Sequence, residues 1–311
     1  MKTRILLMMV LLLWLGTASV AVAQNGAVAQ NTWSSGAPMP YAATRGAAVV
    51  VGNQIVLLGG FIDNGTAVAN TLVYNPASNT WSKGPRLPMP IGAPAAAVVN
   101  NVLYVLGGAI NGSEFSNAVW AYDLQTKTWS AKSPMHNTRQ EFGAVVENNI
   151  IYAIGGYNSG RLDGVESYNP ATDTWTDEAP LLIGKSSFAV GRVGIWIVAA
   201  DGFGWDGLAD NEVYNSFSNT WKTAAPDPGL RSSPCGGAIG SQMYVAGGSR
   251  DWVAVPLTES FSSNNTWETL ADMPQPTMSA FSAVYNRRLY CFGGQAGDFG
   301  EPINNVQIYQ P

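Results

Sequence analysis

Three basic residues recur at one position of the sequence and could hold an anion. Arg139, Lys185 and Arg231 follow one another at intervals of 46 residues. A guanidinium group binds a carboxylate through two parallel hydrogen bonds, so this row predicts a ligand site for an anion. Arg45 and Glu141 lie two residues further along their strands, and alternate strand residues share a face, so we expect them on the same side. The alternative is an internal network of ion pairs with loop carboxylates, or simple solvated charges.

Few groups are suited to catalysis. Glu141 could act as a general acid or base beside Arg139, with His136, the one histidine, nearby in the same loop. One histidine and two cysteines cannot make up a zinc, copper or haem site, so no metal and no cofactor is expected, although oxygen-ligated Ca²⁺ stays open. The chain has no Gly-x-Ser-x-Gly, His-Glu-x-x-His or phosphate-loop motif.

The composition narrows the class of protein. Of 311 residues only 12% are charged, against about a quarter in ordinary soluble domains, while 34 glycines and 11 tryptophans favour an all-β fold. The formal net charge is −5, with an isoelectric point of about 4.9. This balance offers no basic field for phosphate backbones, so we expect no nucleic acid partner.

The N-terminus is typical of an export signal. Lys2 and Arg4 precede an apolar run from residue 5 to 15, and Ala21-Val22-Ala23 has the small-x-small pattern of a cleavage site. We therefore interpret residues 1–23 as a signal peptide of a secreted or periplasmic protein, with no membrane span after cleavage. The alternative is a signal anchor that is retained.

An internal repeat covers the rest of the chain. Six tryptophans end similar phrases, at intervals of 48, 48, 46, 46 and 46 residues. In five of the six repeats a diglycine begins 26 residues after the tryptophan. In the fourth repeat Asp201-Gly202 stands at the same interval. An aromatic follows each diglycine at a nearly fixed distance. The tryptophans are Trp33, Trp81, Trp129, Trp175, Trp221 and Trp267, and the aromatics are Tyr74, Tyr122, Tyr168, Tyr214, Phe261 and Tyr309.

Each repeat predicts four strands. Small or β-branched runs such as residues 45–51 make the first strand, runs ending at the glycines make the second, the aromatic closes the third, and each tryptophan opens a fourth. The diglycine, the downstream tyrosine and the Asn/Asp-Thr-Trp phrase resemble the kelch repeat over about residues 31–311. This resemblance implies a six-bladed β-propeller of four-stranded antiparallel blades. A ring of sheets also covers the apolar faces that a single sheet would expose.

The register of the repeat predicts the domain boundaries and the closure of the ring. The chain starts with a lone fourth strand and ends with a third strand, so we expect the N-terminal strand to complete the last blade. The predicted propeller spans residues 24–311. Its blades are about 41–87, 88–135, 136–181, 182–227, 228–273, and 274–311 together with 30–36.

The loops after the diglycines vary in length and should lie together on one face, the long-loop face. They carry Tyr157, Trp205 and Trp252, which we expect to contact a ligand; alternatively, such aromatics fold back as small local cores. Asp201 either adopts a local strained conformation or offers a carboxylate at the channel mouth. Cys235 and Cys291 align with small or apolar positions, so buried free thiols are expected over a disulfide.

We therefore predict a secreted, monomeric and non-catalytic kelch propeller that binds an extracellular or periplasmic protein or glycan on the long-loop face. The candidate binding residues are Arg45, Arg139, Lys185, Arg231, Asp201, Tyr157, Trp205 and Trp252. The alternative is a carbohydrate-active enzyme similar to the kelch-type sialic acid mutarotase (N-acetylneuraminate epimerase), with Glu141 and His136 as candidate catalytic residues. The repeats here are shorter and more uniform than in that enzyme family, so the resemblance to it is one of fold.

Overall fold

The structure is a computed structural model that describes residues 30–63, 65–111, 114–204, 207–208, 211–297 and 300–311. The predicted signal peptide lies outside these residues. The described residues form strands, turns and bends, and they contain no helix. No helix that could span a bilayer is therefore found in this part of the chain.

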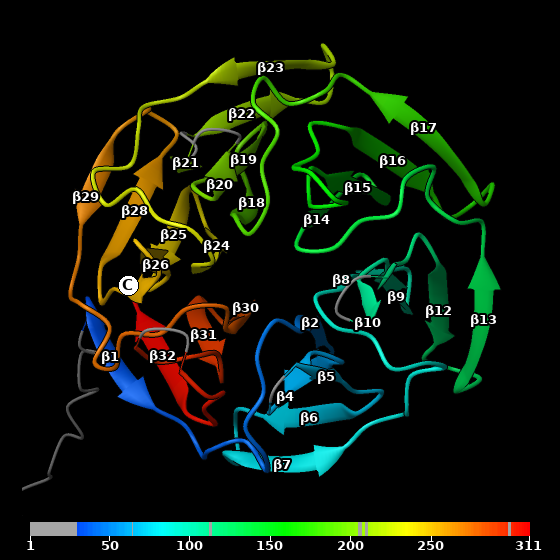
Figure 1. Cartoon of the computed structure of the whole chain (residues 1–311), viewed down its shortest axis with the longest axis horizontal. Coiled ribbons are helices and arrows are strands. Elements are labelled where there is room, and N and C mark those ends of the chain that lie inside the picture. The colour runs from blue at the N-terminus through cyan, green and yellow to red at the C-terminus, as the bar shows by residue number, and fades with distance from the viewer. Residues whose placement is uncertain (1–29, 64, 112–113, 205–206, 209–210, 298–299) are drawn as a thin grey trace, which may run out of the picture.

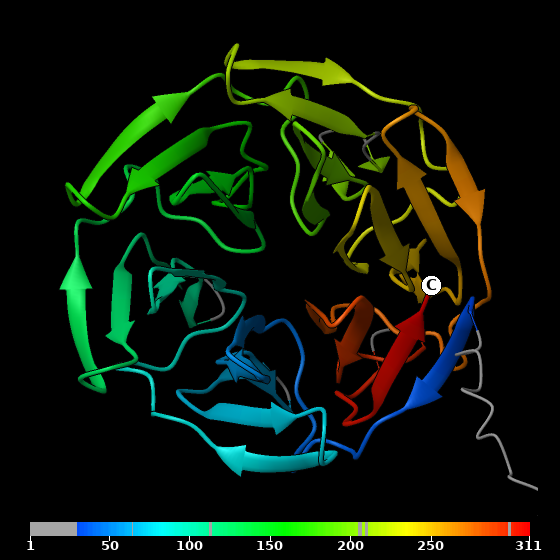
Figure 2. The same ribbon diagram turned by 180° about the vertical axis from the view of Figure 1, so that it is seen from behind.

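Six four-stranded antiparallel sheets stand in a ring around a central channel (Figure 1, Figure 2). The first strand of each blade lines the channel and the fourth lies at the rim. Blade 1 contains β2 (Ala47–Val51), β3 (Gln54–Leu58), β6 (Thr71–Asn75) and β7 (Thr80–Lys83). Blade 2 contains β8 (Ala95–Val99), β9 (Val102–Leu106), β12 (Val119–Asp123) and β13 (Thr128–Lys132). Blade 3 contains β14 (Gly143–Glu147), β15 (Ile150–Ile154), β16 (Val165–Asn169) and β17 (Thr174–Glu178).

The other three blades repeat this arrangement. Blade 4 contains β18 (Ala189–Val193), β19 (Trp196–Ala200), β22 (Glu212–Asn215) and β23 (Thr220–Thr223). Blade 5 contains β24 (Cys235–Ile239), β25 (Gln242–Ala246), β28 (Thr258–Ser262) and β29 (Trp267–Thr269). Blade 6 contains β30 (Phe281–Tyr285), β31 (Arg288–Phe292), β32 (Val306–Gln310) and β1 (Thr32–Ser35). The predicted six-bladed propeller is confirmed.

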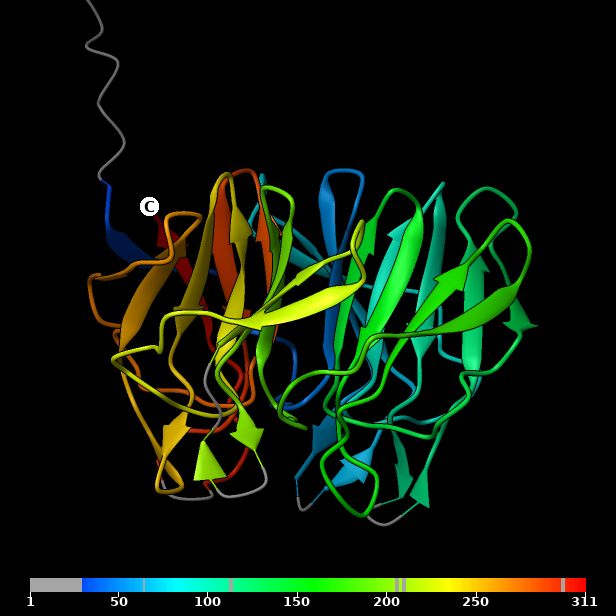
Figure 3. The same cartoon turned by 90° about the horizontal axis from the view of Figure 1, so that it is seen from above.

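Small hairpins project from one face of the ring, which is the long-loop face (Figure 3). Each hairpin follows the diglycine position of its blade. They are β4 (Phe61–Ile62) with β5 (Thr66–Ala67), β10 (Ala109–Asn111) with β11 (Glu114–Phe115), β20 (Phe203–Gly204) with β21 (Gly207–Leu208), and β26 (Ser249–Arg250) with β27 (Val253–Ala254).

The N-terminal strand closes the ring, as the register predicts. Strand β1 pairs antiparallel with β32 from Thr32 opposite Gln310 to Ser35 opposite Gln307. The Trp33 indole N–H also donates to the Ala271 carbonyl at 2.8 Å. The last blade is therefore held by both ends of the propeller, with no edge left on β32.

The tryptophan phrase links neighbouring blades through an indole hydrogen bond in five repeats, whereas the Trp129 indole N–H has no hydrogen-bond partner among the described residues. In blade 3, for example, the Trp175 indole N–H donates to the Ser133 carbonyl at 2.8 Å, and the Asp173 carboxylate accepts from the Ser133 amide. The Tyr168 hydroxyl donates to the same carboxylate at 2.6 Å. The structure thus gives the tryptophan, the tyrosine and the Asn/Asp of the motif a structural role.

The diglycine forms a second link between blades. The amide of its second residue donates to a carbonyl of the next blade in all six repeats, at 2.8–2.9 Å, and Gly294 closes this circle by donating to Ala43. The second residue has φ near +100°, as in Gly202 at 98°, a region that only glycine enters readily. The first position has φ near +60°, which Asp201 adopts at 64°. A carboxylate can therefore replace the first glycine.

Apolar clusters between adjacent blades make up the core. One of them joins blades 6 and 1 and contains Tyr74, Phe281 and Phe292. Another joins blades 5 and 6 and contains Cys235 and Cys291.

These two cysteines form a disulfide, with Cα atoms 5.9 Å apart, so the expectation of free thiols is wrong. Alignment with apolar positions correctly indicated burial, at 1% and 2% exposure, but carried no information about pairing between blades. The bond joins the first strand of blade 5 to the second strand of blade 6.

Candidate functional site

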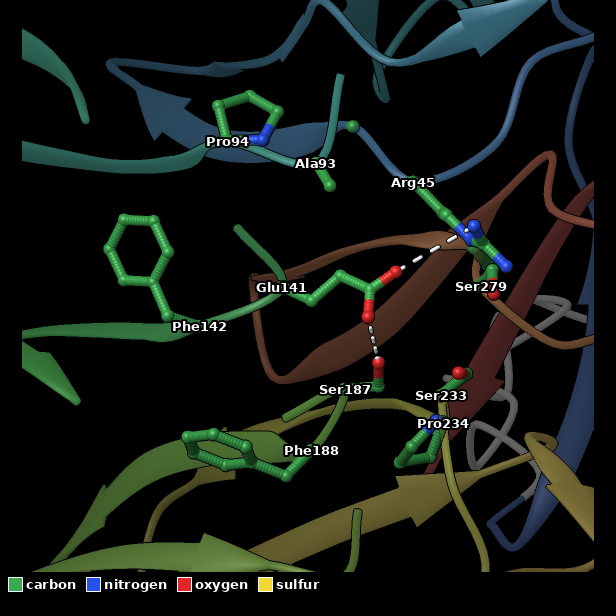
Figure 4. Close-up of a pocket in the computed structure, with 12 residues that line it drawn as sticks. Arg45, Ala93, Pro94, Glu141, Phe142, Ser187, Phe188, Ser233, Pro234 and Ser279 are labelled. Carbon is green, nitrogen blue, oxygen red and sulfur yellow. Dashed lines mark hydrogen bonds and ion pairs between the residues drawn. The ribbon is translucent and has the colours of Figure 1, made fainter. Parts of the chain in front are cut away.

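Six residues with left-handed backbone form a ring at the channel mouth. Each has φ between 46° and 57° and precedes the first strand of its blade. The amide of each residue donates to the carbonyl of its counterpart in the preceding blade at 2.6–3.2 Å, and Arg45 closes the ring by donating to Ser279. The members are Arg45, Ala93, Glu141, Ser187, Ser233 and Ser279 (Figure 4). The backbone thus fixes the mouth rigidly and directs six side chains toward it.

Arg45, Glu141 and Ser187 provide the polar contacts of this mouth. Arg45 Nη1 lies 3.7 Å from Glu141 Oε1, and the Ser187 hydroxyl donates to Glu141 Oε2 at 2.7 Å (Figure 4). The Arg45 side chain is 40% exposed and the Glu141 side chain 20% exposed. The carboxylate is therefore oriented by two partners and still open to a ligand.

The expected pleat relation between these residues and the row of cations is wrong. Arg45 and Glu141 lie outside strands β2 and β14, because their positive φ interrupts the extended backbone. Glu141 points to the mouth, whereas the side chain of Arg139, two residues earlier, is fully buried inside its blade.

The mouth adjoins a larger cavity on the long-loop face. This cavity has a volume of about 350 Å³ and lies against the post-diglycine loops of blades 1 and 6. Arg45 lines both the mouth and the cavity, so the two spaces share a wall. Phe61, Asp63, Gln140, Gln295 and Glu301 are among the other lining residues. Below the mouth the channel wall consists of small or apolar residues such as Ala48 and Val190.

Arg139, Lys185 and Arg231 are all fully buried. Arg139 is paired with Glu166, and Lys185 Nζ lies 3.0 Å from Glu212 Oε1. Arg139 also donates to the carbonyls of Gly155 and Gly164 at 3.0 Å. These cations face partners inside the blades, as the alternative of an internal network describes, although the partners of Arg139 and Lys185 come from third strands and not from loops.

Arg231 lies in the most highly charged cluster of the interior. It is paired with Glu259, and it contacts Asp227 Oδ2 at 3.0 Å and Asp201 Oδ2 at 3.6 Å. Burial raises the pKa of Asp201 well above its ordinary value, and the Asp227 carboxylate adds to this rise. Asp201 is 0% exposed, so its carboxylate is part of the interior and not of the channel mouth.

The carboxylates that pair with the three buried cations occupy one position of the repeat, which the sequence motifs did not reveal. This position lies two residues before the repeat aromatic. In every repeat its residue has the same character as the residue at the cation position, which gives two apolar pairs, three ion pairs and one polar pair. The pairs are Ala43 with Leu72, Ile91 with Trp120, Arg139 with Glu166, Lys185 with Glu212, Arg231 with Glu259, and Thr277 with Gln307. Comparing the two columns of the repeat would have identified the partners.

The family follows from sequence and fold together. Residues 25–186 match the family of KLHDC2/KLHL20/DRC7 Kelch-repeats domains, which is half of the chain. The chain belongs to the kelch-repeat family. Among solved structures, this kelch propeller is similar to the one titled "Structure of YjhT", with a TM-score of 0.76 and 16% sequence identity over 86% of this chain and 95% of that chain. At this identity the likeness concerns the fold. No curated protein sequence matches the chain.

The side chains of His136 and Glu141 have different partners in this kelch propeller, since Glu141 contacts Arg45 and Ser187. His136 Nδ1 is 2.8 Å from Asp177 Oδ1, and this hydrogen bond raises the pKa of the imidazole. Ligand atoms of His136, Asp177 and Glu166 lie within 4.8 Å of one another and could hold a metal ion. Glu166, however, already pairs with Arg139 and accepts from the His136 amide at 2.7 Å. A cation there would compete with both.

The predicted aromatics are partly found on the long-loop face. Trp252 is 51% exposed and its ring centroid lies 5.0 Å from that of Phe203. Tyr157 packs edge-on against Phe115, with centroids 5.8 Å apart. These contacts between neighbouring kelch blades fit the alternative of small local cores, while Trp252 keeps half of its surface open. Trp205 lies outside the described residues.

Proposed function

We propose that the chain is an exported, monomeric and non-catalytic kelch propeller that binds a carbohydrate or protein ligand on its long-loop face. The binding site comprises the Arg45–Glu141 mouth and the adjoining cavity. The observation that carries the proposal is that Arg45 lines both spaces, on a ring closed by backbone hydrogen bonds between all six blades. Ligand sites are typically preformed cavities of about 300–1,000 Å³ with a few polar groups in fixed positions.

Export is supported by the disulfide as well as by the predicted signal peptide. Disulfides persist in oxidising compartments and are rare in reducing ones. The Cys235–Cys291 bond lies in a buried cluster between two blades, where it serves as a structural crosslink.

A sugar mutarotase is the second candidate, and Glu141 is the observation that favours it. Its carboxylate is partly open, lies in a cavity, and is oriented by Arg45 and Ser187. A general acid or base needs this combination of access and fixed orientation. His136 has no contact with this carboxylate in the hydrogen bonds or ion pairs of the described residues, so Glu141 would act without it.

A glycan array, run beside an NMR assay of sialic acid mutarotation, tests both functions. For a ligand found on the array, Arg45→Ala should change the affinity at least about tenfold, since it removes a charge that lines both parts of the site and leaves Glu141 without its cation. Arg192→Ala is the matched control, because Arg192 is also half-exposed and pairs with a glutamate at 2.9 Å, but at the opposite end of the channel.

Mutarotation by the wild type and by Glu141→Gln distinguishes the two functions, because only the enzyme would depend on the Glu141 carboxylate for catalysis. Mutarotation that is fast with the wild type and lost with this variant would establish the enzyme and overturn the non-catalytic assignment. Ligand binding that survives both Arg45→Ala and Glu141→Gln unchanged would remove the site from the channel mouth.

A further inference from the structure

The cavity beside the channel mouth has an unbalanced set of charges. Asp63, in the turn between β4 and β5, and Glu301, next to Pro302, both line it and both are exposed. Neither carboxylate forms an ion pair with any described residue. Arg45 is the single cation among the lining residues, and Glu141 already lies 3.7 Å from it. Asp63 and Glu301 are therefore two negative charges of the cavity wall that have no ion-pair partner among the described residues.

The neutral groups of the cavity add acceptors to this negative charge. The Gln295 amide nitrogen donates one of its two N–H groups to the Gly300 carbonyl at 3.0 Å. Its Oε1 is buried and has no hydrogen-bond partner among the described residues. A buried acceptor without a partner costs free energy until a donor reaches it. The ligand that suits this wall is one that donates.

No described cation other than Arg45 lines this cavity, because Arg161 and Arg250, on the same face, belong to the loops of blades 3 and 5. Arg139, Lys185 and Arg231, the three basic residues nearest the ring in sequence, are buried and neutralised by carboxylates inside their blades. An anionic ligand would meet Arg45 alone and would have to displace Glu141 from it. Like charge at Asp63 and Glu301 would oppose such a ligand further.

We infer that the ligand of this site carries a primary ammonium group, with Asp63 and Glu301 as its counter-charges and Gln295 as an additional acceptor. This inference rests on the proposed binding function and names the chemical class of its ligand. An ammonium group offers three hydrogen-bond donors and one positive charge, which matches a wall of carboxylates and an unpartnered amide oxygen.

Two sources of the same chemistry fit the cavity. An amino sugar presents the ammonium on a ring that also carries hydroxyl groups, and a lysine side chain presents it on a flexible stem. The cavity volume of about 350 Å³ lies near the lower limit for small-molecule sites, which is about 300 Å³. The experiment therefore includes both probes.

Four probes separate charge from shape, each titrated into the full mature chain by calorimetry at low salt. They are a methyl glucosaminide, its N-acetyl derivative, a methyl glucuronide and Nα-acetyl-lysine amide. The glucosaminide should bind at least about tenfold more tightly than its N-acetyl derivative, since only the former keeps the charge-assisted hydrogen bonds, and the glucuronide should bind most weakly. Tight binding of the lysine amide at the same site would assign the ammonium to a peptide, and weak binding would assign it to a sugar.

Isosteric variants locate the site. Asp63→Asn and Glu301→Gln should each weaken glucosaminide binding by about tenfold and leave binding of the N-acetyl derivative nearly unchanged. Asn tolerates the positive φ of 45° at position 63, so the turn is kept. Glu268→Gln, on the exposed outer strand β29, removes the same charge elsewhere and should change nothing.

Each other outcome overturns the inference. Equal or tighter binding of the N-acetyl derivative or the glucuronide would show that the ligand needs no ammonium, and the proposed binding function would stand. Equal loss in Glu268→Gln and Asp63→Asn would show that net charge of the protein, and not this cavity, attracts the amine. Absence of binding by any probe or by any array ligand would remove the binding function together with its ligand class.

Discussion

The buried pair of Arg139 and Glu166 can be replaced by a neutral pair that the same chain uses elsewhere. Thr277 and Gln307 occupy the two equivalent positions in blade 6, where Gln307 Nε2 donates to Thr277 Oγ1 at 3.2 Å. The perturbation is therefore a double-mutant cycle of Arg139→Thr, Glu166→Gln and the two together. We expect the double variant to be more stable than either single variant.

The magnitude follows from burial. Arg139 is 0% exposed and Glu166 1% exposed, so each single change leaves a charge without its partner in the interior. Removing one member of a buried ion pair costs about 3–5 kcal/mol of stability, whereas replacing both members by neutral residues costs far less. Arg139→Thr also takes a donor from the Gly155 and Gly164 carbonyls. At about 2 °C per kcal/mol for a chain of this size, each single variant should melt about 6–10 °C lower.

Urea unfolding of the wild type and the three variants, followed by circular dichroism, measures the cycle. If the losses of unfolding free energy in the two single variants add up in the double variant, the two side chains do not interact, because the effects of independent sites are additive. If Arg139→Thr keeps the wild-type stability and loses ligand binding, the burial of Arg139 is refuted, because Arg139 would then contact the ligand.

Three further predictions concern the closure, the acidic cluster and the disulfide. Deletion of residues 24–36 removes β1 and exposes the edge of β32 near Tyr309, so a truncated chain should aggregate or melt well below the mature chain by scanning calorimetry; equal melting would refute the register. The pKa of Asp201 is raised in the folded state, so folding takes up a proton there and stability falls as pH rises above the ordinary pKa of an aspartate. Asp201→Asn should flatten this decline above about pH 4, and an unchanged slope of melting temperature against pH would contradict the shift. Cys235→Ala with Cys291→Ala should cost about 2–5 kcal/mol in urea unfolding, and a wild type that is no more stable than this variant under oxidising conditions would show that the bond is absent.

The architecture could be predicted from the sequence because repetition makes each blade evidence for the others. Six tryptophans at nearly equal intervals fix the number of blades, and the incomplete first and last repeats fix the closing strand, since a ring must pair its ends. The predicted strand over residues 45–51 begins two residues too early, because Arg45 has a φ of 51° that its sequence does not signal. Arg45 is also a member of the ring at the mouth, so the wrong strand boundary falls at the candidate site.

The disulfide and the counter-charges needed information from across blades. Cys235 and Cys291 are 56 residues apart, and nothing within one repeat indicates that their strands face each other. The partner of Arg139, by contrast, was available from the repeat itself. Glu166 stands where Leu72 and Trp120 stand in repeats without a cation, which indicates that the two positions meet.

This matching of positions decides the charge of the surface. A row of three cations in a sequence predicts an anion site only if the cations reach solvent. In blades 3, 4 and 5 each repeat that gains a cation also gains a third-strand glutamate, as with Lys185 and Glu212, and the pair is buried. The cations are therefore neutralised inside the blades and contribute little field at the mouth. At the mouth Arg45 is left with Glu141, and in the adjoining cavity Asp63 and Glu301 have no cation beside them except Arg45. This wall is therefore negative and favours a ligand that donates hydrogen bonds.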